Sequence, residues 1–224
     1  MKAVAIITVT IITLLSLALA AKYVANGVAT CWVAEDLAAE LTETRPLAEA
    51  GDVEAQYSMG FMYDNGRGVC EDKNEADKWY RLVYISYTAA AKQGSADAQY
   101  SLSHLYSSGH GVSRDLKEAA RWLKKAAAQE HPSSIQNLAY IYNVGWGVPP
   151  NFVKAHMWYL IAFANGYHER DNTDVVDLMT ETELSKAQSM ANECMQSNYK
   201  KCWYEDAEPP PPSDILLPPS LLGN

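Results

Sequence analysis

The amino-acid sequence predicts an all-α protein, a right-handed α-solenoid of about three two-helix repeats with a capping helix at each end. Three observations predict this fold. A Gly-x-Gly-Val motif occurs three times, beginning at Gly66, Gly109 and Gly145, so that successive motifs are 43 and 36 residues apart. A tyrosine precedes each motif by three residues, and a tryptophan follows the first glycine by 13 residues in all three cases. Because so many residues recur in register, the chain contains an internal repeat whose period is typical of helical solenoids.

Each repeat is predicted to open with an amphipathic helix. In the first repeat, Ala55, Met59 and Tyr63 fall on one helical face because each lies four residues after the previous one. Residues of the same kind stand in the same frame in the other two repeats. The three predicted first helices are Asp52–Asn65, Ala96–Ser108 and Ser133–Val144.

A second helix is predicted after each Gly-x-Gly-Val motif. Glycine reaches the left-handed backbone region at little cost, so the motif can end the first helix and turn the chain. Asp72, Asp115 and Asn151 follow each motif by three residues and are typical N-cap residues. The tryptophan of the second helix is expected to fill the core, beside a small alanine that lets the two helices approach closely.

The first repeat is seven residues longer than the second, and the extra residues fall in Leu82–Thr88, inside the predicted second helix. Seven residues are close to two helical turns, so they lengthen the helix by roughly 10 Å with a phase drift of only about 20°. The added residues are largely apolar and aromatic. Two interpretations stay open: the extension packs under the N-terminal segment, or it projects and binds a partner.

These motifs resemble the Sel1-like repeat, a subclass of tetratricopeptide-like helical solenoids. The resemblance rests on A-x-Y-x-[LM]-G-x-x-Y-x-x-G-x-G-V, then D-x-x-x-A-x-x-W-[YL], then A-A-x-x-G, and spans about Leu47 to Gly166. It implies a helical scaffold of the kind that assembles signalling and envelope complexes. It also implies capping helices, because the open ends of a solenoid must be shielded from water.

The chain changes character after the predicted repeats, since six of its ten prolines lie between residues 209 and 219. Such a segment is expected to be extended and unpacked, either as a linker or as a ligand for a groove that binds proline-rich strands. The predicted organisation is a signal peptide or anchor (1–20), an N-terminal capping helix (31–50), three repeats (51–93, 94–129 and 130–166), a C-terminal capping helix (167–204) and a disordered proline-rich tail (205–224).

The first twenty residues have the layout of a secretory signal peptide. Met1-Lys2 gives a positive start, an uncharged and largely apolar stretch follows, and Ala18-Leu19-Ala20 is a cleavage site of the A-x-A type. The alternative is an uncleaved anchor, because the stretch is about as long as a marginal membrane span. The rest of the chain is therefore predicted to be secreted or periplasmic, or to be membrane-anchored and facing outside the cytoplasm.

Four cysteines, at positions 31, 70, 194 and 202, agree with an oxidising compartment. Three connectivities are possible. The preferred pairing is the local one, Cys31 with Cys70 and Cys194 with Cys202. No C-x-x-C motif is present, which argues against a redox or zinc site.

The formal net charge of −9 and the lack of a basic run argue against nucleic acid as a partner. Contact with a membrane is expected only through an uncleaved N-terminal segment. A cationic partner is possible but not required. The five histidines are scattered, so no metal site is predicted, and no motif calls for a cofactor.

Catalytic motifs are scarce in this sequence. Ser197-Asn198-Tyr199-Lys200 fits S-x-x-K, the nucleophile motif of penicillin-interacting enzymes, but the companion S-D-N and K-T-G elements are absent. Some secreted, cysteine-rich proteins with the resembling repeat are associated with β-lactam binding. A β-lactam-interacting hydrolase is thus the least favoured hypothesis, and the chain is predicted not to be an enzyme.

The favoured hypothesis is an extracytoplasmic scaffold, a monomer, that binds a peptide or protein partner on the concave face of the repeat array. First helices line that face in such solenoids. An aromatic centre with polar edges is typical of interface hot spots, although some of the tyrosines could instead pack between adjacent repeats. A membrane-anchored envelope assembly factor or chaperone-like factor is the alternative. The predicted binding residues are Glu54, Tyr57, Phe61, Asp64, Asp97, Tyr100, His104, Gln136 and Tyr140.

Overall fold

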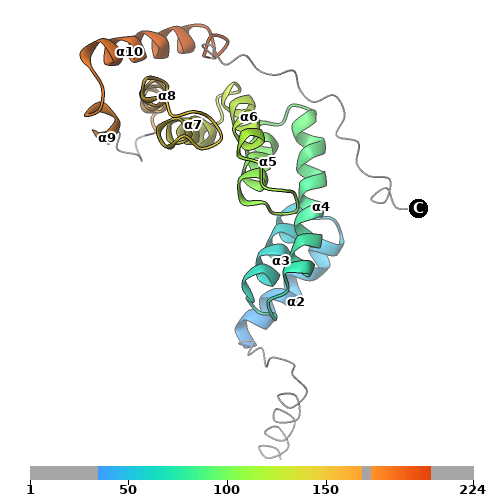
Figure 1. Ribbon diagram of the computed structural model, residues 1–224. Helices are drawn as coiled ribbons and strands as arrows, with labels where there is room; N and C mark the ends of the chain where they lie inside the picture. Colours follow the sequence, from blue (N-terminus) through green and yellow to red (C-terminus); the bar gives the residue numbers. More distant parts are fainter. Residues whose placement is uncertain (1–34, 168–172, 203–224) are drawn as a thin grey trace, which may run out of the picture. The chain divides into compact units, whose positions relative to one another are not determined.

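The computed structural model describes residues 35–167 and 173–202, and all regular secondary structure within these ranges is helical (Figure 1). The helices are α2 (Glu35–Glu49), α3 (Val53–Asn65), α4 (Lys73–Lys92), α5 (Ala96–Ser108), α6 (Leu116–Ala127), α7 (Pro132–Val144), α8 (Phe152–Ala164), α9 (Thr173–Val176) and α10 (Glu181–Gln196). The prediction of an all-α protein is therefore confirmed. The predicted signal peptide and the predicted proline-rich tail lie outside the described residues.

The chain divides into two compact units. The first unit comprises the residues up to Gln93, with α2, α3 and α4, together with His104–Arg114 from the end of α5 and the turn that follows. The second unit comprises Gly94–Ser103, from the start of α5, and the residues from Asp115 onward, with α6 to α10. Consecutive helices pack in pairs within each unit, as the predicted repeats require.

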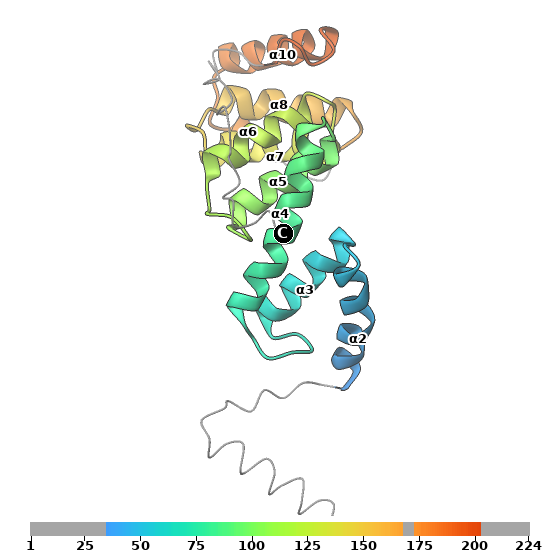
Figure 2. The same cartoon turned by 90° about the vertical axis from the view of Figure 1, so that its right-hand side faces the viewer.

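In the first unit, α3 packs against both α2 and α4 (Figures 1 and 2). Met59 and Met62 on α3 and Trp79 on α4 form the core, with Met59 completely buried. The side-chain amide of Gln56 donates to the carbonyl oxygen of Ala48 at 3.1 Å and ties α3 to the end of α2. The unit is thus centred on the predicted apolar face of the first helix.

In the second unit, α7 packs against α6 and α8, and α10 runs along α8 (Figure 2). One continuous core links the helices, with Leu138 of α7, Trp158 of α8 and Ala191 of α10 at its centre, each at most 1% exposed. The tryptophan of the second helix therefore fills the core, as its recurrence predicts.

The starts of the second helices are where the sequence places them. Asp72, Asp115 and Asn151 are the N-caps of α4, α6 and α8, and each side chain accepts a hydrogen bond from a free backbone N–H group of the first turn. The first helices end at the predicted glycines. Gly66 and Gly145 are left-handed C-caps of α3 and α7.

Helix α4 is longer than its counterparts, with 20 residues against 12 in α6 and 13 in α8. The extension is mostly packed: Val83 is fully buried, and the hydroxyls of Tyr84 and Tyr106 lie 3.0 Å apart. The hydroxyl of Tyr87 donates to Glu54 at 2.8 Å. Only the side chain of Leu82, which is 44% exposed, is left open to solvent among the large apolar residues of the extension. The added turns therefore contribute buried and hydrogen-bonded side chains to the first unit.

Candidate partner-binding surfaces

One position of the repeat is exposed in all three first helices. It holds Phe61 on α3, His104 on α5 and Tyr140 on α7. Phe61 is 42% exposed and Tyr140 is 39% exposed. Each of these residues carries a planar ring on the helix side turned away from its buried neighbours, because the apolar face of the helix is taken up by the core.

The position four residues earlier is half-buried in each first helix and holds Tyr57, Tyr100 and Gln136. In the first unit, the ring of Tyr57 packs edge-to-face on Tyr80 with a centroid distance of 5.4 Å. In the second unit, the ring of Tyr100 stacks on His131 at 4.7 Å. These two tyrosines therefore contribute to packing inside their own units and present only part of their rings to solvent.

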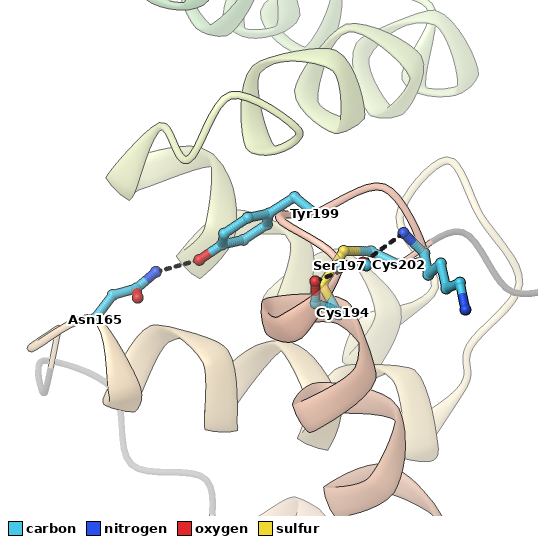
Figure 3. Close-up of a disulfide and its surroundings, with 6 residues drawn as sticks. Asn165, Cys194, Ser197, Tyr199 and Cys202 are labelled. Carbon is cyan, nitrogen blue, oxygen red and sulfur yellow. Dashed lines mark hydrogen bonds between the residues drawn. A yellow bond between two sulfur atoms is a disulfide. The ribbon is translucent and has the colours of Figure 1, made fainter.

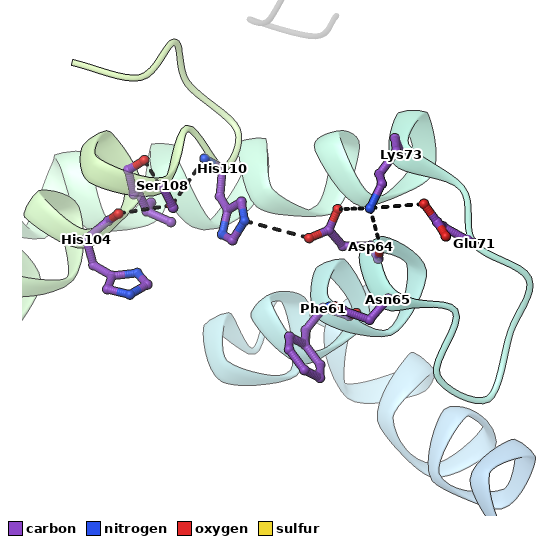
Figure 4. Close-up of polar contacts among 9 residues, drawn as sticks. Phe61, Asp64, Asn65, Glu71, Lys73, His104, Ser108 and His110 are labelled. Atoms are coloured by element: carbon purple, nitrogen blue, oxygen red, sulfur yellow. Dashed lines mark hydrogen bonds and ion pairs between the residues drawn. The ribbon is translucent and has the colours of Figure 1, made fainter. Parts of the chain in front are cut away.

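The predicted carboxylates have partners within their units. Asp64 lies 3.0 Å from the ammonium group of Lys73 and 3.7 Å from Nε2 of His110 (Figure 4). Asp97 lies 3.3 Å from Nε2 of His131, yet its side chain remains 94% exposed. Burial and the nearby carboxylates of Glu54 and Asp64 together raise the pKa of the Tyr57 hydroxyl, so this tyrosine stays neutral.

His110 is a structural residue that the sequence did not single out. Its imidazole stacks on Tyr80 with a centroid distance of 4.2 Å and an interplanar angle of 2°. Figure 4 shows the ring directed at Asp64, while Phe61 and His104 point elsewhere. Burial lowers the pKa of His110, and the carboxylate of Asp64 opposes that shift without overcoming it. Its position between the two glycines of the repeated turn was the one feature of the sequence that could have drawn attention to His110.

The equivalent residue of the next turn, Trp146, is exposed instead. Its side chain is 40% exposed and packs edge-to-face on Tyr140 at 6.2 Å. Val144, at the end of α7, is 49% exposed. This second aromatic residue beside Tyr140 was missing from the predicted set, and it enlarges the apolar surface at the α7–α8 turn.

Three segments of the chain match the Sel1 repeat family, at residues 53–82, 96–131 and 132–167. They contain the three first helices, all of α6 and α8, and the first half of α4. This chain is a Sel1 repeat protein. The first match ends at residue 82, where the extension of α4 begins, so the extension is an addition to the Sel1 repeat pattern.

Two solved structures are similar to this chain. The chain is 22% identical, with a TM-score of 0.50, to a protective antigen of uropathogenic Escherichia coli strains that displays an SLR fold. The alignment covers 78% of this chain and 45% of the antigen, so the chain spans less than half of that protein and the likeness concerns the fold alone. A Sel1 repeat protein from Oxalobacter formigenes is 28% identical over 67% of this chain and 98% of its own length, with a TM-score of 0.39. No curated protein matches the chain.

Sel1 repeats form helical scaffolds that generally serve protein interactions and are usually non-enzymatic. Among the described residues, no group of three or more His, Cys, Asp or Glu side chains is placed to hold a metal ion. No helix within residues 35–167 or 173–202 is both long enough and apolar enough to cross a membrane.

Beyond the Sel1 repeats, Ser197 caps the C-terminal end of α10. Its hydroxyl donates to the carbonyl oxygen of Cys194 at 2.8 Å and accepts from the backbone N–H of Lys201 at 2.9 Å (Figure 3). A serine nucleophile must pass its proton to a base within hydrogen-bonding reach. Here the Ser197 hydroxyl donates its proton to a backbone carbonyl oxygen and not to a base. The S-x-x-K tetrapeptide therefore serves to end the helix.

The predicted pairing of Cys194 with Cys202 is confirmed as a disulfide (Figure 3). Cys70 is also in a disulfide, while its predicted partner Cys31 lies outside the described residues. Disulfides persist in oxidising compartments outside the cytoplasm, which agrees with the predicted localisation.

Proposed function

We propose that this Sel1 repeat protein is an extracytoplasmic scaffold that binds a peptide or protein segment on the exposed side of its first helices. The partner would place apolar side chains against Phe61 in the first unit and against the Tyr140–Trp146 pair in the second. The disulfide-bonded cysteines and the predicted signal peptide support a secreted or periplasmic location.

The observation that carries the proposal is the exposed ring at one position of all three first helices. Aromatic side chains cost free energy when they stay in water, and they are enriched in the centres of interfaces. Phe61 is 42% exposed, Tyr140 is 39% exposed and Trp146 is 40% exposed. Tyr57 and Tyr100 are packed within their units, so they would hold the first helices in place and make little direct contact with the partner.

The test is affinity capture from an envelope extract, using the full chain and two variants that circular dichroism shows to be equally helical. One variant is F61A/H104A/Y140A, and the matched control is L47A/F163A/L178A, which removes exposed apolar side chains from other parts of the chain. A captured protein is then purified, and its affinity for each chain is measured.

We expect the first variant to lose at least about tenfold in affinity, because central aromatic residues are typical hot spots. The control should bind within about twofold of the unchanged chain. Equal binding by all three chains would contradict the proposed surface. Loss only in the control would move the site away from the first helices.

A further inference from the structure

A cluster of lysines stands out in the second unit. Between Asp115 and Ala164 the chain has five lysine or arginine residues and three acidic residues, a local net charge of +2 in a chain of net charge −9. Arg121 is paired with Glu118. Three further lysines, Lys124 and Lys125 on α6 and Lys154 on α8, each lie over a buried aromatic ring, and we call them the lysine cluster.

Two buried aromatic rings, those of Tyr142 and Trp122, contact the lysines of the cluster. The ammonium groups of Lys124 and Lys154 lie 5.8 Å and 5.5 Å from the ring centroid of Tyr142, so they are at most about 11 Å apart. The ammonium group of Lys125 lies 4.5 Å from the ring of Trp122. Cation–π attraction favours these positions of the ammonium groups over the ring faces. The result is an ordered positive surface on the second helices α6 and α8.

The sequence that follows the described residues has the opposite charge. Residues 203–224 contain Glu205, Asp206, Glu208 and Asp214, with no lysine or arginine, and six prolines follow the first three acids. Acidic side chains complement the ammonium groups, and a proline-rich segment loses little conformational entropy when it binds.

The point from which this segment departs is fixed close to α8. Cys202 is bonded to Cys194, and the side-chain amide of Asn165, the C-cap of α8, donates to the Tyr199 hydroxyl at 2.6 Å (Figure 3). Lys154 lies in the first turn of α8, whose 13 residues span about 20 Å. Three to six residues beyond Cys202 can span about 10 to 20 Å. When the segment is extended along α8, Glu208 can therefore reach the far end of the helix, where Lys154 lies, and Glu205 and Asp206 lie on the way to it.

We propose that the acidic stretch Glu205–Glu208 binds the lysine cluster of its own chain and lays Pro209–Pro212 on the surface of α6 and α8. The attraction is electrostatic and intramolecular, so tethering gives it a high effective concentration that an external acidic peptide lacks. This inference goes beyond the proposed function, because it concerns the second helices and assigns them an occupant from within the chain.

The first test is zero-length carbodiimide cross-linking of the full chain at low ionic strength, with the products mapped by mass spectrometry. Lys201 and Glu193, 3.3 Å apart, provide an internal positive control. We expect cross-links from Glu205, Asp206 or Glu208 to Lys124, Lys125 or Lys154. Their yield should fall at least about fivefold near 1 M salt, where the Debye length is about 3 Å.

The second test measures how fast the cluster lysines react with an acylating reagent. In E205Q/D206N/E208Q, the rates at Lys124, Lys125 and Lys154 should rise about fivefold, because the covering carboxylates are gone. D174N/D177N/E181Q changes the net charge equally at exposed positions in α9, in α10 and in the turn between them, and it should leave the rates unchanged.

Three results would overturn the proposal. The first is the absence of tail-to-cluster cross-links when Lys201 and Glu193 cross-link normally. The second is cross-linking of the tail only to its sequence neighbours Lys200 and Lys201. The third is cross-linking between isotopically light and heavy chains in a mixture, which would make a second copy the occupant.

Discussion

The Gly-x-Gly turns at residues 109–111 and 145–147 follow nearly the same backbone path, and yet their central residues have different roles. Both glycines of each turn have positive φ, between 69° and 86°. A Cβ at Gly111 would collide with the backbone of Tyr80 on α4, and one at Gly147 would collide with the backbone of Leu116 on α6. In each unit, the turn therefore rests directly on the preceding second helix.

The central residues show what the motif leaves open. His110 is half-buried, stacked on Tyr80 and directed at Asp64. Trp146 is 40% exposed and leans on the exposed ring of Tyr140. The backbone of the turn is thus a requirement of helix packing, whereas its central side chain can serve either the core of a unit or its surface.

The largest expected effect comes from the shared backbone. We expect Gly111→Ala and Gly147→Ala each to lower the free energy of unfolding by about 3 kcal/mol, because each adds a clash to the cost of a left-handed alanine. Urea unfolding followed by circular dichroism measures the loss.

Gly166→Ala is the matched control for this prediction. Gly166 also has positive φ, at 83°, but nothing lies within 4 Å of the added Cβ. Its loss should be about 1 kcal/mol, from backbone strain alone. Equal losses at positions 147 and 166 would show that close helix contact is not what the turn requires.

The next largest effect is a difference in stability between variants of the two central residues, His110 and Trp146. His110→Ala should cost about 1–2 kcal/mol of unfolding free energy, since it removes the stacked ring and exposes Tyr80. Trp146→Ala, which removes a larger but more exposed side chain, should cost less than about 1 kcal/mol. The same urea titration checks both. A larger loss at Trp146 would mean that its ring supports α7 and is not primarily a surface for a partner.

The smallest effect is a dependence of stability on pH in the first unit. Burial lowers the pKa of His110 below its ordinary value of 6.5, so the unfolded chain binds more protons near and below that pH. The stabilisation by neutral His110 is fully present above about pH 6.5 and is lost as the pH falls through the lowered pKa.

His110→Gln should flatten this part of the profile of unfolding free energy against pH. Burial also lowers the pKa of His156 on α8, so His156→Gln serves as the comparison and should remove a separate contribution. An unchanged profile in His110→Gln would assign the whole effect to other groups.

Much of the fold could be predicted because its signals are local. A cap residue acts on N–H groups two or three positions away, and a glycine reaches the left-handed region by itself. Asp72, Asp115 and Asn151 could therefore be identified as N-caps before any packing was known. The lengthening of α4 could be predicted in the same way, because seven residues preserve the helical phase.

The predicted binding residues were harder to sort, because exposure depends on residues far away in sequence. Tyr57 and Phe61 have the same kind of side chain and lie one turn apart. Only the position of Tyr80, 23 residues after Tyr57, makes the first a packing residue and leaves the second exposed. His110 and Trp146 were overlooked for the same reason, since they occupy the variable position of the motif.

The sequence by itself determined the helical class, the repeat frame and the helix starts and stops, and it favoured the Cys194–Cys202 pairing, because each depends on residue type and short spacing. Only the tertiary structure decided which rings are covered, which carboxylates are paired and where the lysines gather around Tyr142 and Trp122. Those outcomes depend on which side chains from distant helices compete for the same space, and periodicity in a sequence carries no information on that competition.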